Sequence, residues 1–220
     1  MSPFDRSLKT MLQPWVAISW LSFVVLSFFY LDEPIARFFY ELDLRSKLPV
    51  LYWLTNLGVG EFYIAGLFLL AMFYRYVRPN QLKQTRSWFL WLCIIFPYVV
   101  CLVLKVCLGR ARPELLFSHH IYGFFGLHFQ HMYWSFPSGH TTTIMGLVFG
   151  FIVLFPRYCY LFFFAGLMVV STRVLLTNHY LSDVLMTSYL TLLEIGLVLL
   201  FLRRKAWLNA AYQPMNDLAT

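Results

Sequence analysis

Residues 88–108 read WFLWLCIIFPYVVCLVLKVCL and contain a single charged side chain, Lys105. A run of this length is typical of a transmembrane helix, which needs about 17 to 25 apolar residues. Comparable runs occur along most of the chain, near residues 15–31, 61–76, 141–155, 159–177 and 184–202. The sequence therefore predicts an all-α integral membrane protein, built as a bundle of six transmembrane helices.

The overall composition agrees with a membrane protein. Of the 220 residues, 60% are hydrophobic and only 12% are charged, whereas about 25% are charged in a soluble domain. The apolar runs leave little sequence for a second domain, so we predict a single domain over residues 1–220. The net charge of +7 is spread over loop ends, which favours membrane lipids over nucleic acid as partners. No obligate protein partner is evident.

A first cluster of charged residues, Lys105–Pro113, closes the third apolar run. Gly109 can end a helix, and Arg112 stands before a proline, which favours extended backbone. Charged residues at such a place usually face a polar cavity rather than lipid. We therefore expect a cationic loop at this end of the third helix.

Two further polar clusters flank the later runs. Ser135–Thr141 opens the fourth run, where glycine allows close approach of the backbone and the free amides of a helix start bind anions. The third cluster holds Arg173, His179 and Asp183, between the fifth and sixth runs. His179 and Asp183 are four residues apart, so they would share one face if that segment is helical.

Six spans place all three clusters on the same side of the membrane. Three cations, helix-start amides, a hydroxyl, two imidazoles and one carboxylate can then converge on a tetrahedral dianion, which makes phosphate the expected ligand. The candidate site residues are Lys105, Arg112, Ser138, Gly139, His140, Arg173, His179 and Asp183.

These clusters resemble the motifs of the type 2 phosphatidic acid phosphatases (PAP2), which read Lys-x6-Arg-Pro, Pro-Ser-Gly-His and Ser-Arg-x5-His-x3-Asp. All three occur in order, within about residues 98–190. The one departure is Thr172, where the family usually has serine, and threonine keeps the hydroxyl. The resemblance implies a six-helix bundle with its pocket near the outer membrane surface, a phosphohistidine intermediate, and no metal or other cofactor.

The chemistry of the residues suggests a role for each. His179 is the expected nucleophile, with Asp183 fixing its tautomer and supporting the imidazolium. His140 is the expected general acid for the leaving oxygen and the later base for water, because histidine can do both near neutral pH. Positive groups must stabilise the transferring phosphoryl oxygens. The expected phosphate-binding residues are Lys105, Arg112, Ser138, Gly139 and Arg173.

The expected reaction is hydrolysis of a phosphate monoester or diphosphate on a lipid. Similar small bacterial proteins act on lipid A, undecaprenyl diphosphate or phosphatidylglycerophosphate, and lipid A is slightly preferred by resemblance. Two alternatives stay open: a lipid-to-lipid phosphotransferase with the same motifs, and a non-catalytic protein that binds or transports a lipid phosphate.

The distribution of basic residues predicts the orientation. With six spans, 10 of the 17 Lys and Arg residues lie on the side that holds both termini, and 7 lie opposite. The positive-inside rule makes the termini cytoplasmic. The first run has no small-residue cleavage site after it, so we interpret it as a retained helix rather than a signal peptide. We expect a bacterial inner-membrane protein with its active site facing the periplasm.

The remaining polar features receive weaker interpretations. The loop 114–136 contains four histidines but only one carboxylate, Glu114, and no cysteine, so a metal site is not expected there. Its aromatic residues predict that it rests on the interface or closes over the pocket. Arg110 is not a defining motif position, and we expect it to pair with Glu114 or with lipid phosphate. Segment 34–57 is expected to be amphipathic and interfacial.

Overall fold

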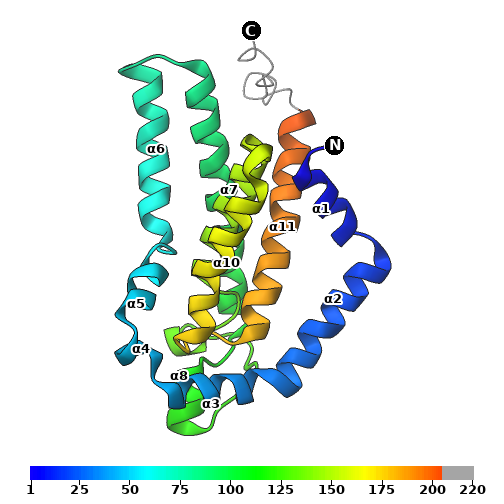
Figure 1. Cartoon of the computed structure of the whole chain (residues 1–220), viewed down its shortest axis with the longest axis vertical. Helices are drawn as coiled ribbons and strands as arrows, with labels where there is room; N and C mark the ends of the chain where they lie inside the picture. The colour runs from blue at the N-terminus through cyan, green and yellow to red at the C-terminus, as the bar shows by residue number, and fades with distance from the viewer. Residues whose placement is uncertain (205–220) are drawn as a thin grey trace.

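The computed structural model describes residues 1–204, and every regular element in that range is helical. Residues 205–220, including the C-terminus predicted to be cytoplasmic, lie outside the described range. The elements are α1 (Pro3–Met11), α2 (Pro14–Leu26), η1 (Ser27–Leu31), α3 (Asp32–Leu42), α4 (Leu44–Lys47), α5 (Pro49–Asn56), α6 (Gly60–Tyr76), α7 (Gln81–Leu108), α8 (Pro113–His119), η2 (His131–Tyr133), α9 (Gly139–Leu154), η3 (Pro156–Tyr158), α10 (Cys159–Leu175) and α11 (Leu181–Arg204) (Figure 1).

Within residues 1–204, four helical segments are long and apolar enough to cross a membrane. They are Pro14–Leu42, Gln81–Leu108, Pro156–Leu175 and Leu181–Arg204. The pair α5 and α6, bent by 41°, can supply a fifth. Helix α9 is apolar but has 16 residues. An all-helical membrane protein is therefore confirmed, whereas the count of six spans stays a prediction.

Helix α9 is the centre of the bundle, where it packs on α7, α10 and α11. It is apolar on all sides, as a helix surrounded by protein must be. It approaches α7 closely at the Cys93 carbonyl, which lacks its helical partner because Pro97 has no N–H. A methyl group at Gly146 would overlap that carbonyl oxygen, and one at Gly150 would lie 2.9 Å from Leu90 Cδ2. Small residues thus let the two backbones meet.

The N-terminal helices pack around this core. Phe4 of α1 is 1% exposed and meets Phe149 edge to face, with ring centroids 5.9 Å apart. Helix α2 has no buried residue. It begins apart from α11 and slants back toward the start of α11, where α3 crosses beneath the bundle (Figure 1). Because α3 crosses there, it can place side chains under the ends of the core helices.

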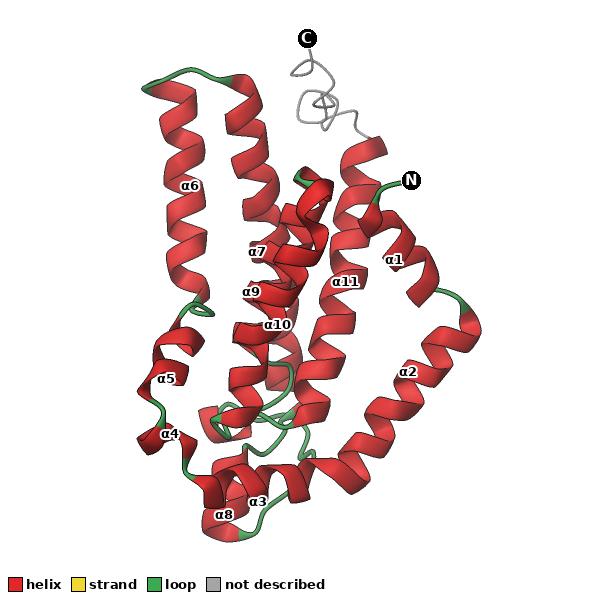
Figure 2. Ribbon diagram, in the orientation of Figure 1, coloured by secondary structure: helices red, strands yellow, loops and turns green. Residues whose placement is uncertain are grey.

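The two ends of the bundle differ. The N-terminus and the α6–α7 turn lie at one end, while the long connection from α7 to α9 folds beneath the other (Figure 2). The end of α7, the start of α9 and the start of α11 meet there, since Lys105 bonds Trp134 and Ser135 bonds Asp183. The prediction that the three clusters lie together is confirmed, whereas their orientation in a membrane stays a prediction.

Candidate active site

The first motif is shaped by the way the following loop caps α7. Gly109 ends the helix with a φ of +51°, and a methyl group there would overlap the Gly126 carbonyl oxygen. The amides of Gly126 and His128 bond the carbonyls of Leu108 and Val106, at 3.2 and 2.9 Å. These bonds satisfy carbonyls that the helix end would leave free. The loop therefore returns across the end of α7 and holds the motif against it.

Three predicted phosphate ligands carry positive charges but contact only neutral acceptors. Lys105 Nζ donates to the Trp134 carbonyl at 2.8 Å, and Arg112 Nε donates to the His131 carbonyl at 3.1 Å. Arg173 Nη1 donates to Thr55 Oγ1 at 2.7 Å. Within residues 1–204, none of the three forms an ion pair with a carboxylate. Such a group of uncompensated cations suits an anionic ligand.

The start of α9 adds to this positive environment. Ser138 caps the helix, with its Oγ accepting from the Thr141 amide at 3.5 Å, and its O–H remains available to donate. Its own amide donates to Thr187 Oγ1 at 3.0 Å. A methyl group at Gly139 would lie 4.0 Å from Lys105 Cε, which places the lysine beside the helix start. The first amides of a helix lack intrahelical acceptors and favour an anion.

His179 lies in the turn before α11 and is 2% exposed. Its Nδ1 is 2.6 Å from the Ser135 carbonyl oxygen. A carbonyl can only accept, so Nδ1 carries the proton and Nε2 keeps its lone pair. This tautomer leaves Nε2 free to act as a nucleophile.

Asp183 does not bond His179 directly, because its Oδ2 is 3.6 Å from His179 Nδ1. The same oxygen accepts from Ser135 Oγ at 2.6 Å and from the Tyr180 amide at 3.0 Å. The four-residue spacing does not stack the two side chains on one helix, because α11 begins only at Leu181. Asp183 therefore contacts Ser135, whose carbonyl accepts from His179, and Tyr180, which follows His179 in the chain.

Electrostatics keep His179 neutral. Burial is the main cause, and the positive charges of Arg112, Arg173 and Lys105 add to it, so that the pKa of His179 lies well below its usual value near 6.5. The same three cations also act on His140. The two histidines and the three cations thus share one electrostatic environment.

His140 lies in the first turn of α9 and is half-buried. Gly58 faces it, since a methyl group at Gly58 would lie 2.7 Å from His140 Cδ2. Gly58 and Thr55, the partner of Arg173, flank the break between α5 and α6. The sequence analysis placed Thr55 in the interfacial segment 34–57, did not single out Gly58, and missed both contacts. Two glycines that interrupt an apolar helical pattern, Gly58 and Gly60, were the available signal.

Arg110 has partners other than those predicted. Its Nη1 lies 2.5 Å from Asp183 Oδ1, and its Nη2 lies 2.6 Å from Asp32 Oδ2. The expected pairing with Glu114 or lipid phosphate is therefore wrong. Asp32 and Asp183 are 78 and 73 residues away in sequence, so local spacing could not show the pairs. Two buried carboxylates require a nearby cation, and Arg110 supplies it.

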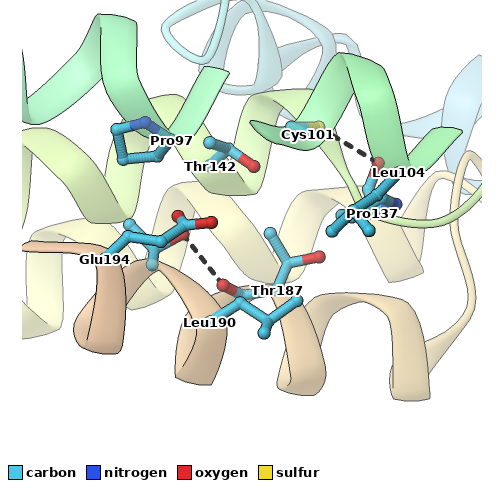
Figure 3. A pocket seen from close by; sticks show the side chains of 9 residues that line it. Pro97, Cys101, Leu104, Pro137, Thr142, Thr187, Leu190 and Glu194 are labelled. Atoms are coloured by element: carbon cyan, nitrogen blue, oxygen red, sulfur yellow. Dashed lines mark hydrogen bonds between the residues drawn. The ribbon is translucent and has the colours of Figure 1, made fainter. Parts of the chain in front are cut away.

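A small polar cavity of about 10 Å³ lies beside the start of α9, between α7 and α11 (Figure 3). Thr187, which accepts from the Ser138 amide, lines it together with Glu194 and Cys101. The Cys101 thiol lies 3.6 Å from the Pro137 carbonyl. This volume is at the lower limit for a single water molecule, so the cavity is far too small for a lipid headgroup.

One histidine of the loop 114–136 contacts a predicted phosphate ligand. His131 Nε2 lies 3.1 Å from Arg112 Nη2. His119 and His120 are exposed. Within residues 1–204, no three His, Cys, Asp or Glu side chains are grouped closely enough to hold a metal ion. The loop thus reaches two predicted phosphate ligands, Arg112 through His131 and Lys105 through the Trp134 carbonyl.

Comparison with known proteins adds a family and relatives. A family model described as the PAP2 superfamily matches residues 86–207. A lipid A 1-phosphatase from Rhizobium johnstonii is 30% identical over 179 residues, which cover 75% of this chain and 70% of the relative. A lipid A 1-phosphatase from Rhizobium etli is 34% identical over 102 residues, covering 45% of this chain and 44% of the relative.

One solved structure is also similar, that of a transmembrane PAP2 type phosphatidylglycerolphosphate phosphatase from Bacillus subtilis. It aligns with 91% of this chain and 92% of its own, at 18% identity and a TM-score of 0.49. The region matched by the family model contains α9, α10 and α11 and most of α7. It therefore includes the three motif clusters but not α3, which carries Asp32.

Proposed function

We propose, from the premise that this chain belongs to the PAP2 superfamily, that it is a lipid phosphatase acting through a phosphohistidine at His179. The observation that carries the proposal is the hydrogen bond from His179 Nδ1 to the Ser135 carbonyl. Because Nδ1 donates to this carbonyl, Nε2 is unprotonated and lies on the opposite edge of the ring. The environment of that nitrogen contains Lys105, Arg112 and Arg173, whose charges favour a phosphate dianion.

In the first step, His179 Nε2 attacks phosphorus while the bond from phosphorus to the lipid oxygen breaks. His140 gives its proton to the departing lipid hydroxyl. A phosphate dianion among the three cations offsets their repulsion and so favours that proton on His140. The products of this step are the free lipid alcohol and N-phosphorylated His179.

In the second step, water attacks the phosphorus of the phosphohistidine. Neutral His140 takes a proton from this water as the new bond forms. The N–P bond breaks, inorganic phosphate leaves, and His179 Nε2 regains its lone pair. Lys105, Arg112, Arg173 and the first amides of α9 stabilise the equatorial oxygens in both steps.

The decisive experiment measures free phosphate from purified protein in EDTA. We expect His179→Ala to lose both turnover and acid-labile phosphoenzyme, by more than about 1,000-fold. His140→Ala, assayed with an activated phosphate ester, should lose turnover to a similar extent but accumulate phosphoenzyme. The leaving group of such an ester departs without a proton from His140, whereas the attacking water still needs His140 as its base. His119→Ala, an exposed histidine outside the site, is the matched control. Full activity in either site variant contradicts the assignment.

For the substrate we propose lipid A, because both curated relatives are lipid A 1-phosphatases. Undecaprenyl diphosphate and phosphatidylglycerophosphate are the two competitors. A panel of the three lipids, each assayed for free phosphate at equal mole fraction in detergent, should show the highest kcat/KM for lipid A. A doubly phosphorylated lipid product without free phosphate would instead indicate a phosphotransferase. Binding without any turnover would indicate a non-catalytic protein.

We also propose that the protein lies in a bacterial inner membrane with its site facing the periplasm. The exposed thiol of Cys107 provides a test, since it is near the active-site end of α7. A membrane-impermeant maleimide should label Cys107 in spheroplasts but not in inverted vesicles. In a Cys107→Ser background, Arg78→Cys at the opposite end should show the reverse. Labelling of Cys107 only from the cytoplasmic side overturns the orientation.

A further inference from the structure

We propose that Arg110 and Asp32 form a positioning pair that holds the nucleophile His179 in place through Asp183 and Ser135. The proposal rests on the phosphatase function above and assigns a role to two residues outside its motifs. Neither residue touches the phosphate ligands. Both act on the reaction only through the residues that orient the nucleophile.

The contacts form one continuous chain. Asp32 bonds Arg110, which bonds Asp183 through its other terminal nitrogen. Asp183 then holds the Ser135 hydroxyl at 2.6 Å, and the Ser135 carbonyl accepts from His179 Nδ1 at 2.6 Å. Every link is a hydrogen bond of ordinary length or shorter. The five side chains therefore transmit any displacement of Asp32 or Arg110 to the imidazole.

The pair is buried and specific in shape. The side chain of Arg110 is 2% exposed and those of both aspartates are 0% exposed. Aromatic rings surround the guanidinium, with the centroid of Tyr180 at 4.8 Å and that of Phe28 at 4.9 Å from its carbon. A planar fork can reach two carboxylates at once, whereas the single ammonium group of lysine cannot. Only arginine therefore completes the chain from Asp32 to Asp183.

Asp32 is itself held from a second direction. Its Oδ1 accepts from the Ser182 amide at 2.9 Å. The Ser182 hydroxyl donates to Asp32 Oδ2 and accepts from Arg110 Nη1. Tyr122 donates to Asp32 Oδ2 at 3.2 Å. These bonds tie α3 to the first turn of α11. The start of α11 follows His179 directly, so its position sets that of the nucleophile.

Asp32 lies outside the region matched by the family model, residues 86–207. The N-terminal helices thus contribute a residue that completes the support of the catalytic histidine. Misplacing reacting groups by about 1 Å can cost about 100-fold in rate. A loosened Asp183 would affect both Ser135 and the Tyr180 amide, so we expect a loss of that order rather than a small one.

The test is a double-mutant cycle between Arg110→Lys and Ser135→Ala. Arg110→Lys should lower kcat by about 100-fold and leave KM and the inhibition constant of inorganic phosphate within about 3-fold, because the phosphate ligands are untouched. Each kcat is divided by the amplitude of the phosphoenzyme burst, which counts folded active sites. Residues that act in one chain are non-additive, so the double variant should be no more than about 3-fold below the worse single variant.

Two variants accompany the cycle. Asp32→Asn keeps the pair of Arg110 with Asp183, so it should fold and show the same split of kcat from KM with a smaller loss, about 10-fold. Arg37→Lys replaces an exposed arginine of the same helix, α3, and should leave kcat unchanged. Losses that multiply in the double variant, or an inhibition constant of inorganic phosphate that rises as kcat falls, overturn the proposal.

A second readout does not depend on turnover. In ¹⁵N-histidine spectra of the full-length protein in detergent, His179 is assigned by its absence from a His179→Gln spectrum. The wild type should show protonated Nδ1 and unprotonated Nε2, and Arg110→Lys should show a mixture of tautomers. An unchanged tautomer in Arg110→Lys and Asp32→Asn overturns the positioning role. Absence of hydrolysis by the wild type overturns the proposed function and leaves this readout intact.

Discussion

Arg110 and Arg112 are two residues apart, yet they occupy opposite electrostatic environments. Arg110 is buried against two carboxylates, Asp32 and Asp183. Arg112 is half-buried and bonds neutral groups: the backbone carbonyl and an imidazole nitrogen of His131, each at 3.1 Å, and the Trp134 carbonyl at 3.4 Å. The two cations therefore differ in charge balance: Arg110 is paired with carboxylates inside the protein, whereas Arg112 forms no ion pair within residues 1–204, as the proposed phosphate-binding role requires.

The unbalanced group includes Lys105 and Arg173 as well. Both are buried, at 7% exposure each, and burying a charge without a counter-ion costs stability. A folded protein that keeps such charges has traded stability for function. The balanced network around Arg110 and the unbalanced cations should therefore respond to substitution in opposite ways, and three experiments test this contrast.

The largest expected effect is on activity, at the unbalanced cations. Lys105→Met and Arg173→Met should each lower kcat/KM for the lipid phosphate by about 1,000-fold, roughly 4 kcal/mol, because each removes a charge that stabilises the transferring phosphoryl group. Lys83→Met, at the opposite end of α7, is the control and should leave kcat/KM unchanged. Steady-state assays of phosphate release measure all three. A loss below 10-fold in both site variants would remove these cations from the phosphate site.

The next effect is on stability, and its sign should differ between the two groups. Arg110→Met should lower the free energy of unfolding by about 3 kcal/mol or more, because it leaves two buried carboxylates without their cation. Lys105→Met should leave it unchanged or raise it, because it removes an unbalanced buried charge.

Thermal unfolding in detergent compares these variants with Arg37→Met. That control breaks an exposed pair with Glu33, 3.4 Å apart, which is worth at most about 0.5 kcal/mol. The contrast between balanced and unbalanced cations fails if Lys105→Met is as destabilising as Arg110→Met.

The smallest effect is on pH dependence. Burial and three cations lower the pKa of His179, so the imidazole stays unprotonated well below pH 6.5 and phosphoenzyme formation should persist there. Arg112→Gln removes one of the charges that oppose the imidazolium. The pKa should then rise toward its usual value, and the acid limb of phosphoenzyme formation should move to higher pH.

Rapid-quench measurement of the phosphoenzyme across pH 4 to 8 tests this shift. Arg78→Gln, a charge change at the far end of the bundle, should leave the acid limb in place. An acid limb that moves to lower pH in Arg112→Gln would show that the cation does not act on His179 as inferred.

Much of the site was predictable because each motif is short. Lys105, His140 and His179 were identified from spacing within single segments, and Gly109 ends its helix as expected. Segments of this length carry their own signals, since apolar runs, helix-start residues and glycine conformations are local properties. The membrane class followed from composition in the same way.

Contacts between segments were not predictable in this way. The sequence analysis did not single out Asp32, and it placed Thr55 in an interfacial segment, yet these residues bond Arg110 and Arg173. The sequence analysis expected Asp183 to act directly on His179, four residues away. In the structure Asp183 is connected to His179 through Ser135, which belongs to a different motif. The spacing of residues within one segment does not indicate which side chains from distant segments will contact them.

The sequence by itself determined that the chain is a helical membrane protein, and it supplied the candidate residues for attack, proton transfer and phosphate binding, because these depend on residue type and local pattern. Only the tertiary structure decided which cation is balanced and which is free, and which nitrogen of His179 carries the proton. Those properties depend on distances of a few ångströms between helices far apart in the chain, where burial makes each charge require a partner or a ligand.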